Sequence, residues 1–523
     1  MTLGAPPSPV DCEALLTQMS LEALVGQLLI VFFQGSRLSP ALQHMIREVQ
    51  VGGLILYAVS GNTESARQVA ELVRDAQGAS AIPLWISIDQ EGGAVVRLTR
   101  GVTAFPTPMA VAAAGSLDWA REMATALGTE LRHVGINLTY APLLDVNSNP
   151  ANPIIGLRAF GRDPQQVADW GLATLAGYEA AGLATTGKHF PGHGDTSVDS
   201  HVGLPVVTAS QERLEQVELY PFRAAIRQGI PTLMTAHVVV PTWDPDWPAT
   251  LSKRILTQIL RQELGFTGLI ITDSLSMGAL AHYASLPELA IRSLEAGADV
   301  ILLGADVGHT PDEQLPVFEA LLNAVHNGRL SRDRIVDSVR RILLTKARYG
   351  LWPVRDPHLL VSGRSTVSTP DHEALALTIA RHSLTLVGET TLLPLDPHQP
   401  LLCLWPQDLY DLGSPLSGVF PQIRCYPFQR PHLEVNALLA SLPLDQNLPI
   451  LLAIHNLERY PEQRHLVEHL PPERTPVVNT GSPYDLHPCP WPRLITYGHQ
   501  SLCLHALVSW LQAGSPPSGH IVF

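Results

Sequence analysis

Residues 84–97 read LWISIDQEGGAVVR and contain the pattern on which the fold depends. A short, mostly apolar run over residues 84–89 ends at the carboxylate of Asp89, and two glycines follow closely. Helix-like stretches separate this run from its neighbours, and such runs are typical of parallel strands that are buried on both faces. Seven further runs of this kind occur between about residues 25 and 305, at 28–33, 53–57, 138–146, 184–189, 232–238, 269–273 and 300–303.

The alternation of eight apolar runs with helical stretches predicts an α/β protein whose N-terminal part is a (β/α)8 TIM-type barrel. A doubly wound open sheet has the same alternation and remains the alternative. We expect the barrel catalytic domain over residues 1–350, a linker rich in Pro, Ser and Gly over 351–370, and a smaller C-terminal α/β sandwich domain over 371–523. In that last part, strands are predicted at 384–387, 401–405, 450–454 and 476–479.

The composition of the chain excludes several classes of function. Of the 523 residues 46% are hydrophobic, and the formal net charge is −14, so the chain can bury a large core but lacks the clustered Lys and Arg of a nucleic-acid binder. A polybasic membrane anchor is equally unsupported, and no apolar run approaches the ~20 residues of a membrane span. No secretory signal is visible, so we expect a cytoplasmic protein. Five scattered cysteines without CxxC spacing predict neither a disulfide framework nor a zinc site.

The densest polar stretch is KHFPGHGDTSVDSH, residues 188–201, which follows the fifth apolar run. Its glycines and proline break any helix, so we expect a loop at the carboxyl end of a barrel strand, where active sites are assembled. An ordinary surface loop would not explain so many titratable groups beside a buried strand. Asp199 and His201 are two residues apart, so in an extended segment Asp199 can orient the imidazole of His201 and favour a general acid/base.

A metal site is the alternative interpretation of the same loop. Its possible ligands are His189, His193, Asp195, Asp199 and His201. The chain has no HExxH motif, however, and no second stretch of comparable density would complete the set of ligands. We therefore expect neither a metal nor a cofactor.

Three other candidate sites follow apolar runs or lie in loops, and they contain four polar residues. Asp273 ends the run LIITD, and a carboxylate there is costly unless it is hydrogen-bonded or used, although capping a helix that begins near Leu275 would explain it equally well. Capping plus a surface ion pair would explain Asp89 and Arg97, and Arg158 would otherwise be an ordinary surface arginine. A barrel would bring these strand ends together. Two such groups on either side of an acetal, one a nucleophile and one a proton donor, are the arrangement of a retaining glycosidase.

Six motifs of the first 350 residues, in order and spacing, resemble glycoside hydrolase family 3, and specifically its bacterial β-N-acetylglucosaminidase (NagZ-like) branch. They are DQEGG (89–93) with the arginine at 97, APLLDVN (141–147), IIGLRAFGRDP (154–164), GKHFPGHGDTSVDSH (187–201), MTAHVVVP (234–241) and TDSLSMG (272–278). The remainder is more weakly similar to the family's C-terminal α/β sandwich, through HSLTLVGETTLLPL (382–395), TGSPYDL (480–486) and SPPSGHIVF (515–523).

The resemblance implies a retaining β-N-acetylglucosaminidase (β-N-acetylhexosaminidase) that releases terminal, non-reducing N-acetylglucosamine by double displacement. Asp273 falls on the family's nucleophile, and His201 with Asp199 falls on the acid/base dyad peculiar to this branch. The remaining matches are to positions that bind the same sugar unit, namely Asp89, Arg97, Arg158, Lys188 and His189. Muropeptide or chitooligosaccharide fragments are the expected substrates, and cell-wall recycling, a part of peptidoglycan turnover, is the expected setting.

Three other functions remain open. A β-glucosidase of the same family is one, although that branch takes its acid/base Glu from elsewhere and lacks the D-x-H loop. A phosphorylase acting on N-acetylglucosaminides is the second, because a histidine acid/base does not repel phosphate as a carboxylate would. A non-catalytic carbohydrate-binding protein is the third, disfavoured because both proposed catalytic groups are intact. The oligomeric state and the natural leaving group are not predicted.

Overall fold

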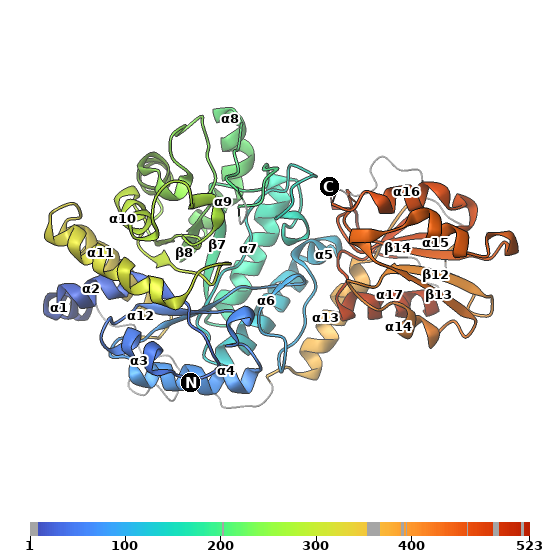
Figure 1. Cartoon of the computed structure of the whole chain (residues 1–523). Helices are drawn as coiled ribbons and strands as arrows, with labels where there is room; N and C mark the ends of the chain where they lie inside the picture. Colours follow the sequence, from blue (N-terminus) through green and yellow to red (C-terminus); the bar gives the residue numbers. More distant parts are fainter. Residues whose placement is uncertain are drawn as a thin grey trace.

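The chain forms two separate sheets, each with its own helices (Figure 1). The structure is a computed structural model, and it describes residues 9–200, 203–352, 367–388, 392–393, 395–457, 459–484, 491–513 and 517–522. His201 and most of the expected linker therefore lie outside the described residues, and the expected domain boundaries remain predictions. No helix within these ranges is long and apolar enough to cross a membrane.

The first sheet is an eight-stranded parallel barrel in the order β10-β1-β2-β3-β6-β7-β8-β9. The two end strands meet through a bridge between Ile271 and Val300, where the N–H of Thr272 donates to the carbonyl of Val300 at 3.0 Å. This bridge confirms the predicted barrel and shows that the open sheet was wrong. Each strand lies within one of the eight predicted runs or, for β7, overlaps it: β1 Leu29–Val31, β2 Gly53–Leu56, β3 Trp85–Ile88, β6 Leu138–Thr139, β7 Ala184–Phe190, β8 Thr232–Thr235, β9 Leu269–Ile271 and β10 Ile301–Leu302.

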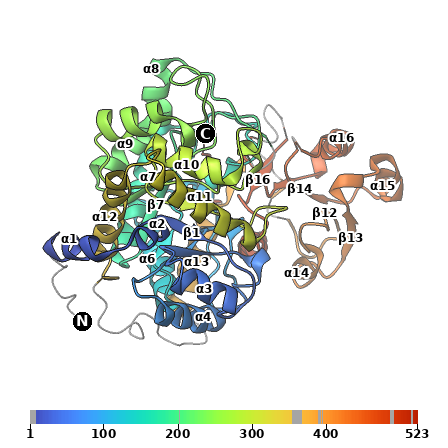
Figure 2. The same ribbon diagram turned by 60° about the vertical axis from the view of Figure 1, so that its left-hand side comes forward.

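Helices surround the barrel strands (Figures 1 and 2). Most of them have apolar side chains that recur on one face; in α4 the buried residues include Val69, Leu72, Val73 and Ala76. The helices are α1 Pro9–Gln18, α2 Leu21–Gln27, α3 Pro40–Arg47, α4 Ala66–Ala79, α5 Pro108–Ala113, α6 Leu117–His133, α7 Pro164–Ala180, α8 Gln211–Arg213, α9 Leu219–Arg227, α10 Leu286–Ala296, α11 Gln314–His326 and α12 Arg332–Arg348, with π-helical turns η3 Leu214–Glu218 and η5 Arg254–Glu263.

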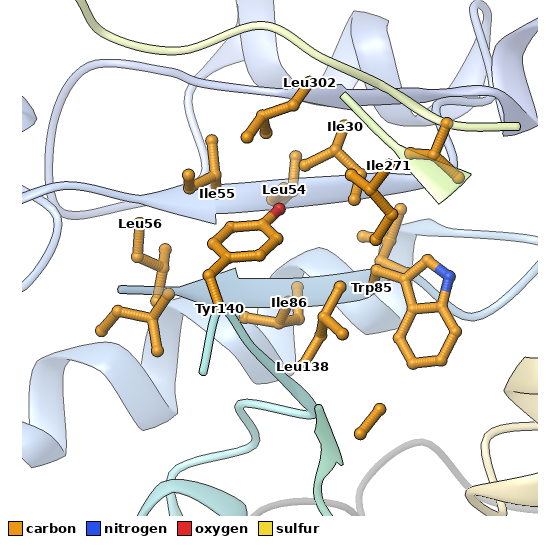
Figure 3. Packing of buried hydrophobic residues seen from close by; sticks show 14 of the residues in the cluster. Ile30, Leu54, Ile55, Leu56, Trp85, Ile86, Leu138, Tyr140, Ile271 and Leu302 are labelled. Atoms are coloured by element: carbon orange, nitrogen blue, oxygen red, sulfur yellow. The ribbon is translucent and has the colours of Figure 1, made fainter. Parts of the chain in front are cut away.

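Large side chains of neighbouring strands fill the space between them (Figure 3). Trp85 of β3 and Tyr140, which follows β6, are both buried among isoleucines and leucines. The hydroxyl of Tyr140 donates to Oγ of Ser87 at 2.9 Å, so the polar end of this ring is not left unsatisfied. Close packing of this kind fixes where each strand ends, and the polar residues that follow the strands are fixed with it.

The second sheet, here called the C-terminal sheet, has the order β11-β16-β15-β14-β12-β13. Only β11 runs antiparallel to its neighbour, so its mixed α/β character agrees with the prediction. Four strands were predicted, whereas the edge strand β13 and the three-residue β16 were not. The elements are α13 Pro370–Ser383, β11 Thr385–Val387, β12 Leu401–Pro406, α14 Gly413–Ser417, β13 Ile423–Phe428, α15 Val435–Ser441, β14 Ile450–Ile454, α16 Glu462–His469, β15 Val477–Asn479, β16 Arg493–Ile495 and α17 Ser501–Ala513.

The C-terminal sheet lies beside the barrel, with α5 and α13 between them (Figure 1). An apolar cluster that includes Met109 of α5 and Ile495 of β16 joins the two parts. The hydroxyl of Thr107 donates to the carbonyl of Tyr497 at 2.8 Å across the same contact. The carboxyl ends of strands in both sheets therefore have fixed positions relative to each other.

Candidate active site

A cavity of about 370 Å³ opens at the carboxyl ends of the barrel strands, and we call it the first cavity. Its size is in the range of small-molecule sites. The residues that line it come from the ends of β7, β8 and β10 and from the segments that follow β2, β3, β6, β7, β9 and β10. Six residues predicted from the sequence are among them: Asp89, Arg97, Arg158, Lys188, His189 and Asp273.

Asp199 of the predicted acid/base dyad lies beside this cavity. Ser200 lines the first cavity, whereas Asp199 lines a neighbouring cavity of about 670 Å³, the second cavity. The two cavities share Ile154, Ile155 and Arg158 in their walls. His201 is outside the described residues, so the pairing of Asp199 with His201 remains a prediction.

Three ion pairs centred on Lys188 and Glu91 lie at one wall of the first cavity. Nζ of Lys188 lies 2.7 Å from Oδ1 of Asp89 and 2.6 Å from Oε1 of Glu91, and Arg158 makes a two-pronged contact with Glu91 at 2.8 and 2.9 Å. Burial alone would raise the pKa of Glu91, but Arg158 and Lys188 outweigh it and hold that pKa well below its ordinary value. Charged groups held in this way are suited to binding sugar hydroxyls by short, charge-assisted hydrogen bonds.

Glu91 was not predicted as a site residue, although it lies in the DQEGG motif. It belongs to the strand β4 (Gln90–Gly92), which pairs with β5 (Val95–Val96) in a short hairpin. The hairpin needs its glycines: Gly93 has φ +61°, and a Cβ there would lie 2.1 Å from Cγ2 of Thr107. The alternation of Asp89 and Glu91 along an extended segment is the signal that could have identified Glu91.

Arg97 extends from the end of the same hairpin into the first cavity. Its Nε is buried and has no hydrogen-bond partner in the part of the chain that the structure describes. A buried donor without a partner is costly, so this guanidinium is available to a ligand. Asp89 and Arg158 are likewise part of the cavity wall, and the alternatives of a helix cap and a surface arginine were wrong for them.

Asp273 follows β9 and faces the first cavity. Its Oδ1 accepts from the N–H of Ser274 at 2.7 Å, and its Oδ2 lies 4.0 Å from Nε2 of His189. Burial would raise the pKa of Asp273, but His189, His237 and that N–H lower it below the ordinary value. The carboxylate is therefore charged at neutral pH, as a nucleophile requires. The next helical turn, η6 (Gly278–Leu280), has Met277 as its N-cap, so the capping alternative for Asp273 was wrong.

Asp145 is a buried carboxylate that the sequence analysis did not select. Its Oδ2 lies 2.7 Å from Nδ1 of His189, and its Oδ1 accepts from the N–H of His193 at 2.7 Å. His189 and His193 hold the pKa of Asp145 below its ordinary value, although burial alone would raise it. This carboxylate fixes the ring of His189 beside Asp273. A signal was present in the sequence, since Asp145 is a carboxylate within the apolar stretch APLLDVN.

His193 holds the loop that carries Asp199 and Ser200. Its ring nitrogens lie 2.8 Å from Oγ1 of Thr196 and 3.1 Å from Oγ of Ser200. Burial, followed by the neighbouring His189, lowers the pKa of His193 to about 4, so the ring is neutral at physiological pH. Gly194 allows the close approach of this loop to the loop after β6, because a Cβ there would lie 1.7 Å from the carbonyl oxygen of Val146.

The described part of this loop does not form a metal-binding arrangement. Within the described ranges, no three His, Cys, Asp or Glu side chains gather as a set of ligands. Asp195 instead pairs with Arg213 at 3.6 Å, and His193 bonds to hydroxyl groups of its own loop. Asp195 and His193, two of the donors that suggested a metal site, therefore have other partners.

The sequence of the barrel also matches a known family. The profile of the glycosyl hydrolase family 3 N-terminal domain matches residues 20–345. The chain belongs to glycosyl hydrolase family 3. This family 3 protein is thus a glycoside hydrolase, which confirms the class predicted from the sequence.

Relatives of this family 3 protein include proteins named for hexosaminidase activity. It is 36% identical over 382 residues to a "Beta-hexosaminidase A" of Pseudoalteromonas piscicida; the match covers 68% of this chain but only 63% of that relative. It is 33% identical over 415 residues to a "Beta-N-acetylglucosaminidase/beta-glucosidase" of Cellulomonas fimi, covering 77% of this chain and 70% of that one. A family 3 β-N-acetylglucosaminidase structure from Paenibacillus sp. superposes with a TM-score of 0.88 at 35% identity, over 96% of this chain and 98% of that chain.

Proposed function

We propose that this family 3 protein is a retaining β-N-acetylglucosaminidase that removes terminal, non-reducing N-acetylglucosamine. The observation that carries the proposal is the position of Asp273. Its charged carboxylate faces a cavity for one sugar, between the ion pairs of Glu91 and the loop of Asp199 and Ser200. A nucleophile and a proton donor on either side of one ring are what retention requires.

In the first step, Oδ2 of Asp273 attacks the anomeric carbon while the bond from that carbon to the leaving oxygen breaks. His201, charged and oriented by Asp199, gives its proton to the leaving oxygen. The product is a covalent glycosyl-enzyme with inverted configuration. Asp89, Arg97, Arg158, Lys188 and His189 hold the sugar during this step through its hydroxyl and amide groups.

In the second step, neutral His201 takes a proton from water, whose oxygen attacks the anomeric carbon. The bond to Asp273 breaks, the carboxylate is restored, and a second inversion gives net retention. A histidine in this role suits a loop whose glycines allow it to approach the glycosidic oxygen when substrate is bound.

The preference for N-acetylglucosamine over glucose rests on the D-S-H sequence of the loop and on the names of the relatives. The Pseudoalteromonas relative and the Paenibacillus structure carry a hexosaminidase or β-N-acetylglucosaminidase name, whereas the name of the Cellulomonas relative gives β-glucosidase as well. We further propose that muropeptide or chitooligosaccharide fragments are the substrates, in cell-wall recycling in the cytoplasm.

An assay with aryl β-N-acetylglucosaminide and aryl β-glucoside tests the proposal. The wild-type protein should hydrolyse the first at least tenfold faster, should release the β-anomer first, and should keep its activity in EDTA. A requirement for phosphate, with a sugar 1-phosphate as product, would replace hydrolysis by phosphorolysis. A faster reaction with the glucoside would contradict the substrate class.

Removal of the nucleophile gives the sharper test. Asp273→Ala should abolish turnover, and added azide should restore some reaction and give the α-glycosyl azide, because a small anion can enter the space of the lost carboxylate. The matched control is Asp246→Ala, since Asp246 is exposed. Near wild-type activity of Asp273→Ala would contradict the assignment.

A further inference from the structure

The second cavity lies between the barrel and the C-terminal sheet. It has a volume of about 670 Å³, nearly twice that of the first cavity. One side comes from the barrel loop at 150–158 and from Asp199, and the other side comes from residues that follow β14, β15 and β16. The proposed mechanism uses none of the groups on that second side.

The two cavities are placed to hold the groups on either side of the glycosidic bond that is broken. Ser200 lines the first cavity and Asp199 lines the second, so the loop with the proposed proton donor stands at their boundary. The leaving oxygen must lie beside that donor, and the sugar to be released lies in the first cavity. The group beyond the leaving oxygen therefore points into the second cavity. This step rests on the proposed function.

The two sides of the second cavity differ in character. The barrel side presents an apolar patch of Pro153, Ile154 and Leu157 beside the polar Asn152, Arg158 and Asp199. The side of the C-terminal sheet presents mainly polar groups, among them His455, Arg459, His499 and Gln500. An apolar patch opposite several hydrogen-bonding groups is suited to a sugar ring, which has an apolar C–H face and polar hydroxyls at its edge.

The topology of the C-terminal sheet also points to binding at this edge. After β12 the chain continues to β13 on one side and then returns to β14 on the other, so the connections change direction between β12 and β14. Open α/β sheets bind ligands beyond the carboxyl ends of their strands at such a point. His455 comes directly after β14. Tyr410 follows β12, and its ring stacks on the ring of His499 with 6.1 Å between the ring centroids.

The histidines of this edge are uncharged hydrogen-bonding groups. Burial, together with the nearby charge of Arg430, lowers the pKa of His455 to about 3 and that of His499 to about 4. Nδ1 of His499 is buried and has no hydrogen-bond partner among the described residues. Nδ1 of His455, in contrast, lies 3.2 Å from Oγ1 of Thr480, which holds that ring in place.

A third, smaller cavity continues from the second. It has a volume of about 320 Å³ and shares His499 and Gln500 with the second cavity. Its other walls come from Tyr410 and from the first turns of α17, including Ser501. The three cavities thus follow one another from the barrel across the edge of the C-terminal sheet.

We propose that the second cavity is the binding site for the leaving group, that the C-terminal sheet supplies its polar side through Arg459 and His499, and that the leaving group is a saccharide of one or more N-acetylated units. A longer saccharide continues into the third cavity. In this arrangement the barrel determines which sugar is released, and the C-terminal sheet determines what it is released from.

The test compares two substrates with the same sugar in the first cavity. One is a trisaccharide of β-1,4-linked N-acetylglucosamine, and the other is β-N-acetylglucosaminyl azide, whose leaving group is too small to reach the C-terminal sheet. Arg459→Ala combined with His499→Ala should lower kcat/KM for the trisaccharide at least tenfold, mainly through KM. The azide should react within twofold of the wild-type rate.

The matched control is Arg424→Ala combined with His469→Ala. Arg424 lies within the edge strand β13, and His469 ends α16, at the opposite end of the sheet from the second cavity. Both substrates should react as in the wild type. An equal loss of both substrates by the Arg459/His499 variant, or no loss of the trisaccharide, would overturn the proposal, whereas failure of the wild type on both substrates would instead refute the proposed function.

A measurement on the wild-type protein does not depend on the folding of the variant. Because di-, tri- and tetrasaccharides have the same leaving-group chemistry, only contacts beyond the first cavity distinguish them. We expect kcat/KM to rise at least threefold from the disaccharide to the trisaccharide. Equal values for all three lengths would overturn the assignment of the third cavity to a longer leaving group, since the second unit of that leaving group would then contribute nothing.

Discussion

Oδ2 of Asp145 lies 2.7 Å from Nδ1 of His189, on the far side of the imidazole from Asp273. Nε2 of the same ring lies 4.0 Å from Oδ2 of Asp273, so one histidine connects a fully buried carboxylate to the proposed nucleophile. A carboxylate that bonds one ring nitrogen determines which nitrogen carries the proton and how the ring is turned. Asp145 can therefore influence the pKa of Asp273 through His189 without touching the substrate.

Asp145→Asn tests this positioning role. The amide cannot match the charge that holds His189, so we expect kcat/KM with aryl N-acetylglucosaminide to fall by roughly 10²-fold. His189 lowers the pKa of Asp273, and a displaced ring would let that pKa rise. The acid limb of the pH profile should therefore move to higher pH. The control is Asp195→Asn in the neighbouring loop, and a loss of stability without a shift of the acid limb would show that Asp145 is only structural.

Glu91→Gln removes a buried negative charge that forms ion pairs with two cations. The side chains of Glu91 and Lys188 are each only 2% exposed, so their pairing is strongly shielded from water. Breaking such a pair costs about 3–5 kcal/mol, because a charge is left buried with fewer partners. We expect that loss in urea unfolding, together with a higher KM for the sugar.

The control for this prediction is Glu71→Gln. Glu71 also pairs with an arginine, Arg67 at 2.9 Å, but on the exposed face of α4. An exposed pair contributes little, so stability and KM should both stay close to the wild type. Equal effects of the two substitutions would contradict the role of the buried ion pairs.

Substrates with different leaving groups test His201. An aryl leaving group with low pKa departs without a proton, whereas an alkyl or sugar leaving group needs one. His201→Ala should therefore reduce turnover of a disaccharide by about 10²- to 10⁴-fold and turnover of a nitrophenyl glycoside much less. His326→Ala, at the exposed end of α11, is the control. Equal losses on both substrates would argue against His201 as the acid.

The barrel was predictable because its strands are buried on both faces and so produce apolar runs. The edge strand β13 has no such run: Arg424 and Cys425 are exposed, and the strand contains a proline. Its pairing with β12 is decided by tertiary contacts that a local pattern does not contain.

Residues of the candidate site were predictable where their own residue type determines their role, as for Asp273. They were not predictable where that role depends on a partner that is distant in the sequence. Glu91 bonds Arg158, 67 residues later, and Asp145 bonds His189, 44 residues later. Neither separation leaves a periodic signal. Buried carboxylates of this kind are identified only when the fold brings their partners to them.

Lys346 of α12 gives a prediction for stability against pH. It is fully buried, and its Nζ lies 3.0 Å from Oε1 of Gln27 and 3.0 Å from the carbonyl of Gly52. Burial lowers its pKa from 10.5 to about 7. Between those two values the unfolded chain binds a proton that the folded chain does not, so the free energy of unfolding should decrease as pH falls from 10.5 to 7.

We expect the free energy of unfolding of the wild type, relative to Lys346→Met, to rise by several kcal/mol from pH 7 to pH 10. Methionine has a similar length and no charge, so the variant keeps the packing and loses this titration. Urea unfolding at a series of pH values measures the difference, with the exposed Lys253→Met as control. If the difference between the wild type and Lys346→Met does not change with pH, the amine of Lys346 is charged in the folded protein at neutral pH, and the cost of burial is offset by its two oxygen partners.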